Sequence, residues 1–482
     1  MAVLGNIEPK QVFHFFEELC QIPRATFDTK RVSDYCVKFA KDRGLFVTQD
    51  EANNVIIRKG GTAGYENSEP VILQGHLDMV CVKTADSTHD FDSEPLDIFV
   101  EDGFVKAKDT SLGGDDGIAV AMAMALLDSD DIAHPPIEAV FTTDEETGMG
   151  GANAIDLSVL KGRKLINIDS EIEGILTAGC AGGISLMTEI PVKREKRKGT
   201  LVRLEVTGLQ GGHSGIEIDK QRGNAHKLMG HLLSEISGKT EIYLADINGG
   251  EKDNVISMVS TSGILVPEEE VCKVKETAEK MKAVWDNEFM GDEPSLEVKA
   301  EAEGETELNV CDRESTDKVI HYLFVCPNGV QCFARKLEGL VESSLNIGIV
   351  KTTEEYINAG HMIRSSVESQ KQAMYRQVDC LAGLVGGTSH ITSEYPAWQY
   401  NPSSELCGVM QKIYKEMFHE EPKVFAVHAG LECGLFLGKR PDLDCVSVGP
   451  NLLDVHSVNE KVDIASVERT WEYLKAILKE LK

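Results

Sequence analysis

VILQGHLD, residues 71–78, is an apolar run that leads directly into a histidine and an aspartate. A short apolar run of this kind favours a buried strand. Further apolar runs lead into acidic residues or histidine at residues 139–146, 165–169 and 445–456. Because open α/β sheets place their sites just beyond the carboxyl ends of strands, we expect these four strand ends to carry the functional site.

Helical patterns accompany these strands at both ends of the chain. Apolar residues recur at helical spacing in residues 9–20, 32–40, 118–127, 405–418 and 464–481. The alternation of strands and helices predicts one α/β domain built from both ends of the chain. We place its two parts at residues 1–185 and 398–482.

The middle of the chain has a different pattern. Residues 200–207, 257–265 and 343–350 alternate between apolar and polar side chains, as half-buried strands do. Residues 186–397 are therefore predicted to form an inserted α+β domain. Within it, the acidic stretch 267–307 contains a helix-like piece, 271–285, and we interpret the charged residues that follow as a solvated linker or hairpin.

Composition excludes several classes of partner. The 482 residues are 42% hydrophobic and 27% charged, an ordinary globular profile. With 49 basic and 79 acidic side chains, the net charge is −30, which opposes binding to nucleic acid or to anionic membrane surfaces. This charge favours solubility, with steering of cationic substrates as the alternative interpretation.

Cysteine usage and the amino terminus indicate a cytoplasmic protein. The 12 cysteines include no Cys-x-x-Cys pair, which favours reduced, buried thiols over disulfides or a thiolate zinc site. The first residues lack a basic segment followed by an apolar one, and no apolar run is long enough to span a membrane.

The candidate site residues have alternative interpretations when each is taken alone. His76 and Asp78 suit a metal-bound imidazole oriented by a carboxylate, but also a surface turn or a hydrogen-bonded core histidine. Asp115 precedes a helix, where an aspartate can ligate a metal or cap the helix. The adjacent acids Glu145 and Glu146 can divide their work, one binding a metal and the other addressing the activated water, or form an ordinary acidic loop.

Together the candidates form a more specific set. Two imidazoles and three carboxylates are enough to hold two zinc ions about 3.5 Å apart if one carboxylate bridges them. Such nitrogen and oxygen ligands also suit manganese or cobalt, so the ligands alone leave the metal open. The set is His76, Asp115, Glu146, Asp169 and His456.

The motifs around these residues occur in the order found in a known family. Gly75-His-Leu-Asp78, Gly114-Asp-Asp-Gly117, Asp144-Glu-Glu-Thr-Gly148 and His456-Ser457 resemble the metal motifs of the co-catalytic zinc peptidases, which include carboxypeptidase G2, peptidase T and aminoacylase. The stretches at residues 110–117 and 429–436 are most similar to the aminoacyl-histidine dipeptidase branch. The resemblance implies a catalytic domain with a mixed central sheet flanked by helices, and an inserted α+β lid domain.

The resemblance also implies a role for each metal-site residue. Asp115 would bridge two zinc ions, with His76 and Asp169 on one ion and Glu146 and His456 on the other. Asp78 would orient His76, Glu145 would be the general base, and the peptide bond that follows Asp115 would be cis.

Three residues of the middle domain match further family motifs. His213, in Gly211-Gly-His-Ser-Gly215, resembles the lid histidine that polarises the scissile carbonyl. Arg364 resembles the arginine that binds the substrate carboxylate, and Asn254 resembles a substrate-binding asparagine. Without the resemblance, these two would be interpreted as a surface arginine and a turn asparagine.

The expected activity is hydrolysis of small peptides, mainly Xaa-His dipeptides, and the sequence leaves open whether β-Ala-His is one of the substrates. The alternatives are an aminotripeptidase, an N-acyl amino acid deacylase and a non-enzymatic metal-binding scaffold. The resemblance further implies two zinc ions per chain, for which cobalt or manganese could substitute, and a homodimer.

Overall fold

The computed structural model describes residues 3–482, which divide into two compact units. The first unit comprises the chain up to Gly179, Tyr400–Ala426 and Leu431–Lys482, and the second comprises Cys180–Gln399 and Val427–Gly430. The domain boundaries expected from the sequence stay a prediction, and the sequence pattern did not indicate the return of residues 427–430 to the second unit.

Within the described residues, the first unit holds an eight-stranded sheet of order β1-β2-β6-β3-β7-β21-β8-β20. β3 is parallel to β6 and β7, and β21 is parallel to β7, while β1, β2 and β8 pair antiparallel. The predicted α/β class with a mixed sheet is therefore confirmed. The strands are β1 (Phe46–Gln49), β2 (Val55–Lys59), β3 (Val71–His76), β6 (Ile137–Thr142), β7 (Lys164–Asn167), β8 (Ile175–Cys180), β20 (Lys423–Val427) and β21 (Asp444–Ser447).

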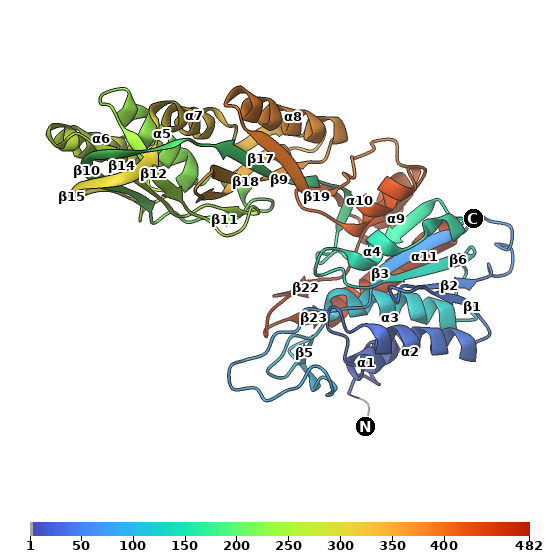
Figure 1. Cartoon of the computed structure of the whole chain (residues 1–482). Coiled ribbons are helices and arrows are strands. Elements are labelled where there is room, and N and C mark those ends of the chain that lie inside the picture. Colours follow the sequence, from blue (N-terminus) through green and yellow to red (C-terminus); the bar gives the residue numbers. More distant parts are fainter. Residues whose placement is uncertain (1–2) are drawn as a thin grey trace. The chain divides into compact units, whose positions relative to one another are not determined.

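Helices cover this sheet, with α1, α2 and α3 gathered on one face of it (Figure 1). α3 is apolar all round and buried from Gly114 to Leu127, as expected of a helix enclosed by other elements. Its side chains join those of β3, β6 and α11 in one hydrophobic core. The helices are α1 (Lys10–Cys20), α2 (Lys30–Asp42), α3 (Gly114–Asp128), α4 (Gly150–Ala154), α9 (Glu405–Phe418), α10 (Glu432–Lys439) and α11 (Ile464–Glu480).

A small sheet of order β22-β23-β5-β4 completes the first unit. Its strands are β4 (Ile98–Glu101), β5 (Phe104–Ala107), β22 (Leu452–Leu453) and β23 (Lys461–Asp463). Short 3-10 helices occur along the chain at η1 (Leu157–Val159), η2 (Ile218–Lys220) and η3 (Glu268–Glu270).

The second unit has its own hydrophobic core and two larger sheets. One has the order β12-β14-β10-β15, and the other the order β16-β17-β18-β9-β19. The strands are β9 (Gly182–Pro191), β10 (Arg194–Thr207), β12 (Tyr243–Asn248), β14 (Ser260–Val266), β15 (Glu297–Cys311), β16 (Gly329–Phe333), β17 (Val341–Thr352), β18 (Tyr356–Ser365) and β19 (Thr388–Tyr395), with a separate pair β11 (Gly212–His213) and β13 (Val255–Ile256). The helices are α5 (Ala225–Ser237), α6 (Val271–Phe289), α7 (Arg313–Val325) and α8 (Glu368–Leu384).

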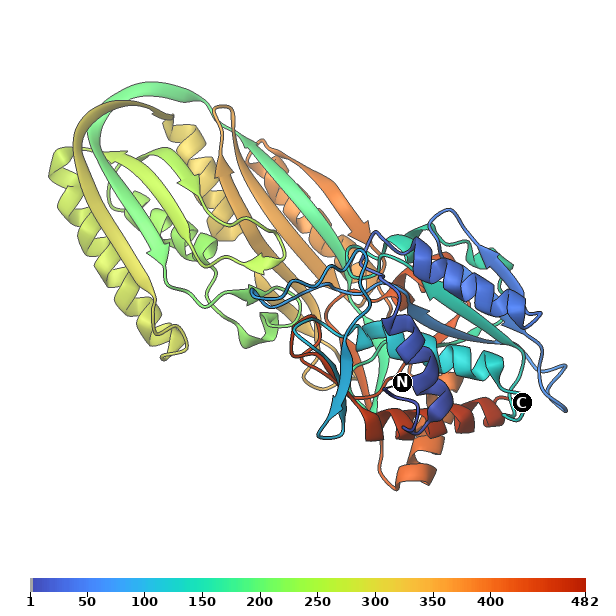
Figure 2. The same ribbon diagram turned by 90° about the horizontal axis from the view of Figure 1, so that it is seen from below.

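One local expectation in this unit is wrong. The charged residues after α6 form the long strand β15 instead of a linker or hairpin, and β15 pairs antiparallel with β10 along its length (Figure 2). The pairing is possible because β15 is the edge strand of its sheet, so most of its acidic side chains remain exposed to solvent.

Candidate metal and catalytic site

The neighbouring parallel strands of the first unit bring the predicted site residues to one edge of the sheet. His76 ends β3, and Glu145 and Glu146 follow β6. Asp169 follows β7, and His456 lies after β21 in the loop between β22 and β23. Parallel strands share the direction of their carboxyl ends, which explains why residues so distant in sequence meet.

His76 presents one ring nitrogen to each of two environments. Its Nε2 lies 3.1 Å from Oδ1 of Asp115 and 3.6 Å from Oδ1 of Asp169. Its Nδ1 lies 3.1 Å from the carbonyl oxygen of Asp78 and 3.5 Å from that residue's Oδ1. Asp78 therefore orients the ring so that Nε2 faces the other carboxylates, which is how a carboxylate prepares a histidine for metal binding.

Asp78 also holds the loop that follows β6. Its carboxylate accepts hydrogen bonds from the backbone N–H of Glu145 at 3.1 Å and of Glu146 at 3.4 Å. The hydroxyl of Thr26 donates to the same carboxylate at 3.0 Å. Burial opposes the charged form of Asp78, but the hydrogen bond with His76 and these donors lower its pKa. One carboxylate thus fixes His76 and both glutamates.

His456 approaches the other side of Asp115. Its Nε2 lies 3.1 Å from Oδ2 of Asp115 and 2.9 Å from Oε2 of Glu146. The two oxygens of Asp115 therefore face two different imidazoles, each accompanied by a further carboxylate. A carboxylate in this position is able to hold two cations at once.

The loop that carries Asp115 is held by two residues that the sequence motifs did not single out. Glu460, which is buried, accepts hydrogen bonds from the backbone N–H groups of residues 112–115. Arg24 donates to the carbonyl oxygens of Leu77 and Gly113 and so ties this loop to the segment after β3. Gly113 has a left-handed conformation, and a Cβ there would overlap Arg24.

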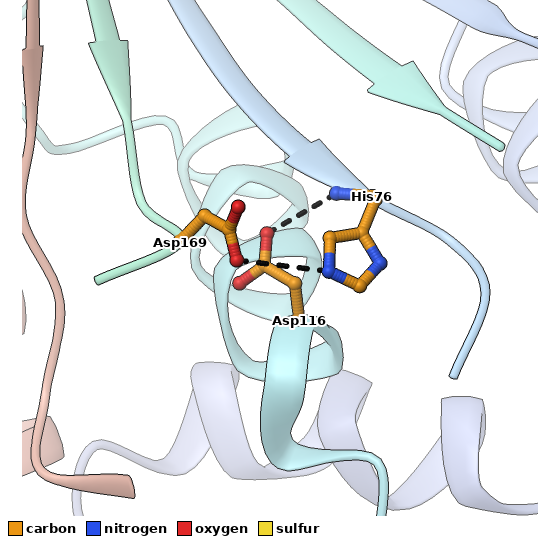
Figure 3. Close-up of side chains that lie close together, drawn as sticks. All are labelled: His76, Asp116 and Asp169. Atoms are coloured by element: carbon orange, nitrogen blue, oxygen red, sulfur yellow. Dashed lines mark hydrogen bonds and ion pairs between the residues drawn. The ribbon is translucent and has the colours of Figure 1, made fainter. Parts of the chain in front are cut away.

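Asp116 is a further member of the site. The peptide bond between Asp115 and Asp116 is cis, which confirms that expectation. Figure 3 shows Asp116 beside His76 and Asp169, with its Oδ2 accepting a hydrogen bond from the backbone N–H of His76 at 3.1 Å. Burial and then the nearby Asp169 raise the pKa of Asp116 well above its ordinary value. Asp116 therefore accepts a hydrogen bond from the backbone of β3. Its carboxylate also belongs to a group of side chains that could hold a metal ion.

The electrostatics of the site reflect several buried acids around two imidazoles. Burial and neighbouring carboxylates raise the pKa of Asp169 to about 6, although His76 opposes this shift. Hydrogen bonds to Asp115 and Glu146 raise the pKa of His456 to about 11. Burial raises the pKa of Glu145 well above its ordinary value, and Asp169 adds to that shift. A positive charge at this place is strongly favoured.

The donor set fits a pair of divalent cations. Ligand atoms of His76, Asp115 and Glu146 lie within 4.8 Å of one another, and so do those of His76, Asp116 and Asp169. Imidazole nitrogen and carboxylate oxygen are ligands for zinc, manganese and cobalt alike.

Glu171 is another acid near this site that sequence motifs did not indicate. Burial first, and then the nearby Asp115 and Asp169, raise the pKa of Glu171 to about 7. Its place two residues after Asp169 is the only sequence signal for it.

The second unit brings its three predicted residues together. β11 pairs with β13, so that His213 lies opposite Val255, and the backbone N–H of Ser214 donates to the carbonyl oxygen of Asn254 at 2.9 Å. Burial and then the charge of Arg364 lower the pKa of His213.

The hydrogen bonds of the His213 ring determine which of its nitrogen atoms carries the proton. Its Nδ1 accepts hydrogen bonds from the backbone N–H groups of Gly215 and Ile216, both at 3.2 Å. The neutral ring therefore carries its proton on Nε2, which is free to donate to an oxygen atom.

Arg364 is a buried cation without a carboxylate partner in residues 3–482. It is 4% exposed, its Nη1 donates to the hydroxyl of Tyr395 at 2.7 Å, and its Nε has no hydrogen-bond partner. The buried His428 lies close enough for Arg364 to add to the effect of burial, which lowers the pKa of His428 to about 3. A buried guanidinium of this kind favours an anionic ligand. His428 stands just before the motif at residues 429–436, which was its only sequence signal.

No helix of the described residues is both long and apolar enough to cross a bilayer.

Comparison with known proteins gives consistent results. The model of peptidase family M20/M25/M40 matches residues 72–480. The chain is 35% identical over 483 aligned residues to the cytosol non-specific dipeptidase of Escherichia coli (strain K12), covering 100% of this chain and 99% of that protein.

Solved structures show the same relationship. The aminoacylhistidine dipeptidase of Vibrio alginolyticus superposes with a TM-score of 0.94 at 34% identity, covering 99% of this chain and 98% of that one. Aminopeptidase PepT of Bacillus cereus has a TM-score of 0.56 at 14% identity and covers 98% of this chain and 99% of that one, a likeness of fold alone.

Proposed function

The chain belongs to peptidase family M20/M25/M40, and from this premise we propose that it is a dipeptidase with a dinuclear metal site, which prefers Xaa-His dipeptides. The observation that carries the proposal is the position of Asp115. Its two carboxylate oxygens each lie 3.1 Å from the Nε2 atom of a different histidine. In our proposal His76 and Asp169 would hold one ion, Glu146 and His456 would hold the other, and Asp115 would contribute to both.

The catalytic steps follow from the positions of Asp78 and Glu145. When bound, two divalent ions would lower the pKa of a water molecule and polarise the scissile carbonyl. Glu145 accepts the proton of that water and passes it to the leaving amine. The raised pKa of Glu145, which burial causes first, suits a group that must both take and return a proton. Asp78 fixes the position of the Glu145 backbone relative to the ring of His76, because its carboxylate contacts both.

The residues of the second unit supply substrate binding in this proposal. His213 donates a hydrogen bond from its Nε2–H group to the carbonyl oxygen on which negative charge develops. Arg364 binds the substrate carboxylate, and the lack of an acidic partner for it within residues 3–482 supports this role. Asn254, beside His213, contributes a polar contact to the substrate backbone.

The amino end of the substrate needs an acidic partner. Glu171 lies close enough to Asp115 and Asp169 for their charges to raise its pKa, so it is placed to meet an ammonium group near the ions. Recognition of an amino group at one end and a carboxylate at the other would favour dipeptides over longer chains.

Three further assignments accompany the proposal. Zinc is the proposed metal, and cobalt or manganese can substitute because the same ligands suit them. A cytoplasmic location agrees with the name of the Escherichia coli relative. The homodimer implied by family resemblance stays a prediction, as does the choice between His213 of the same chain and that of a second copy.

The deciding experiment is a substrate panel with the zinc-loaded protein. It compares several Xaa-His dipeptides, β-Ala-His, dipeptides without histidine, a tripeptide and an N-acetyl amino acid. We expect Xaa-His dipeptides to be cleaved most rapidly, and Glu145→Ala to abolish cleavage while retaining bound metal.

The other outcomes assign the chain differently. Equal cleavage of dipeptides without histidine would indicate the broad activity that the name of the Escherichia coli relative suggests. A preference for the tripeptide or the N-acetyl substrate would indicate an aminotripeptidase or a deacylase. No metal-dependent cleavage of any substrate would contradict the proposal and favour a metal-binding scaffold.

A further inference from the structure

Glu432, in the first turn of α10, is a buried carboxylate that the proposed chemistry does not use. It belongs to the sequence stretch 429–436, and its side chain is 1% exposed. We propose that Glu432 is a positioning residue that fixes the ends of β3, β6 and β7 and thereby the metal ligands they carry. This inference rests on the proposed dinuclear site.

The contacts of Glu432 join two neighbouring strands. Its Oε2 accepts a hydrogen bond from Nε2 of Gln74, on β3, at 2.6 Å. The same oxygen accepts a hydrogen bond from the hydroxyl of Thr142, on β6, at 2.8 Å. Gln74 stands two residues before His76, and Thr142 stands three residues before Glu145. Each contact therefore lies just before a residue of the site.

The hydrogen bonds continue to a third strand. Oε1 of Gln74 accepts a hydrogen bond from Nδ2 of Asn167, on β7, at 2.5 Å. The side-chain oxygen of Asn167 in turn accepts the backbone N–H of Asp169 at 3.4 Å. A continuous path thus runs from Glu432 through Gln74 and Asn167 to the backbone of a proposed ligand.

The composition of these strands makes this network unusual. β3 and β6 are buried along their whole length, and the other side chains facing the core at their centres are apolar. Polar groups in such a place cost stability unless each finds a partner. Glu432 provides the shared acceptor for two of them, and its other oxygen, Oε1, has no hydrogen-bond partner among the described residues.

Glu432 lies near several residues of the proposed metal site. Burial raises the pKa of its carboxyl to about 8, with Asp169 and Asp78 near enough to contribute and His76 opposing them. A neutral side chain that offers the same acceptor oxygen should therefore replace it. Glu432→Gln offers one, whereas Glu432→Ala leaves Gln74 and Thr142 without their shared partner.

Glu138, a buried glutamate on the same strand as Thr142, supplies a matched control. It is 3% exposed, lies near the start of β6 and accepts the backbone N–H groups of Lys161 and Gly162 at 2.8 and 2.9 Å. Glu138→Ala therefore removes a buried acceptor from β6 at the end opposite the site. It should lower thermal stability without changing the metal site.

The experiment measures metal affinity by competition with a chelator, the visible absorption spectrum of the cobalt-loaded protein, and kcat and KM. Loss of a direct hydrogen-bond partner of a metal ligand typically weakens metal affinity about 10- to 100-fold. Because Glu432 acts through Gln74 and Thr142, we expect Glu432→Ala to weaken metal affinity by about 10-fold, the lower end of that range. We also expect an altered cobalt spectrum and a fall in kcat larger than the change in KM. Glu432→Gln should restore all three measurements towards wild type.

Other results would overturn the inference. If Glu432→Ala lowers only the melting temperature, as Glu138→Ala should, Glu432 has a purely structural role. If Glu432→Ala does not fold, Thr142→Val removes one of the two bonds with little change of shape, and an unchanged cobalt spectrum in that variant contradicts the proposal. Absence of metal binding or dipeptidase activity in the wild type would instead contradict the proposed function, so the two failures are distinguishable.

Discussion

His456 follows Asp115 by 341 residues, yet its Nε2 lies 3.1 Å from Oδ2 of that aspartate. The other oxygen of Asp115 lies at the same distance from Nε2 of His76. One carboxylate therefore contacts two histidines, one in the first hundred residues of the chain and one near its carboxyl end. The two contacts can be separated by mutation.

Removing the His456 side chain should abolish binding of one metal ion, and changing Asp115 should lower the affinity for both ions. We expect His456→Ala to retain a single metal ion and Asp115→Asn to bind both ions weakly, with activity lost in each case because the two ions act together. Elemental analysis after dialysis against limiting chelator measures the stoichiometry. Exposed His14 of α1 provides the control His14→Ala, which should keep both ions. Two ions retained by His456→Ala would exclude His456 as a ligand.

Glu145 should matter for the rate but not for metal content. Glu145→Gln removes the proton acceptor, and kcat should fall about 10²- to 10⁴-fold, the usual contribution of general acid–base catalysis. The neighbouring Asp144 has a left-handed backbone that asparagine tolerates, so Asp144→Asn is a matched control. Steady-state kinetics with parallel metal analysis checks this, and wild-type turnover by Glu145→Gln would assign the base elsewhere.

Arg364 should determine the preference for a free carboxylate. Loss of a hydrogen bond to a charged group costs about 1.5–3 kcal/mol, so Arg364→Met should raise KM for a dipeptide roughly 10- to 150-fold. The corresponding dipeptide amide lacks the charge, so its KM should change little. The exposed Arg376 of α8 provides the control Arg376→Met. Equal effects of Arg364→Met on the dipeptide and its amide would argue against carboxylate binding.

Stability of the second unit should fall in mild acid because of His361. This residue is 0% exposed, its Nε2 contacts the hydroxyl of Tyr322 at 2.8 Å, and burial lowers its pKa to about 3. Between the ordinary pKa of about 6.5 and that value, the unfolded chain binds a proton that the folded chain does not. The free energy of unfolding therefore decreases as pH falls, by about 2 kcal/mol at pH 5 from this group.

His361→Gln tests this pH dependence because glutamine can still bond Tyr322 but does not titrate. The melting temperature of this variant should decline less between pH 7 and pH 5 than that of the wild type. The exposed His390 of β19 supplies the control His390→Gln, which should follow the wild type. Parallel declines in all three proteins would show that His361 does not contribute.

The sequence predicted those features that follow from local pattern. The strand ends before His76, Glu145 and Asp169 were predicted because buried parallel strands form recognisable apolar runs, and α9 was predicted at its observed bounds, Glu405–Phe418. The metal set was assembled from motifs, and the structure brings its five members to one edge of the sheet, although their assignment as ligands stays a prediction.

Other residues could not be found from local pattern because their partners are distant in sequence. The bond between Gln74 and Glu432 spans 358 residues, and that between Leu112 and Glu460 spans 348. The residues next to Glu432 and Glu460 in the sequence do not indicate which distant residues these glutamates contact. β15 was missed for a different reason: its sequence alternates between charged and mostly apolar residues, but we interpreted its many acidic residues as a solvated linker or hairpin.

The position of β21 has a consequence for synthesis of the protein. This strand lies between β7 and β8 in the sheet, although both of those strands are made by residue 180 and β21 only at residues 444–447. A nascent chain on the ribosome must therefore leave a gap in its first sheet while the whole second unit emerges. His456 is made later still, so the second imidazole arrives only when the sheet can close. A chain truncated before β21 lacks both the finished sheet and His456, one of the five proposed ligands.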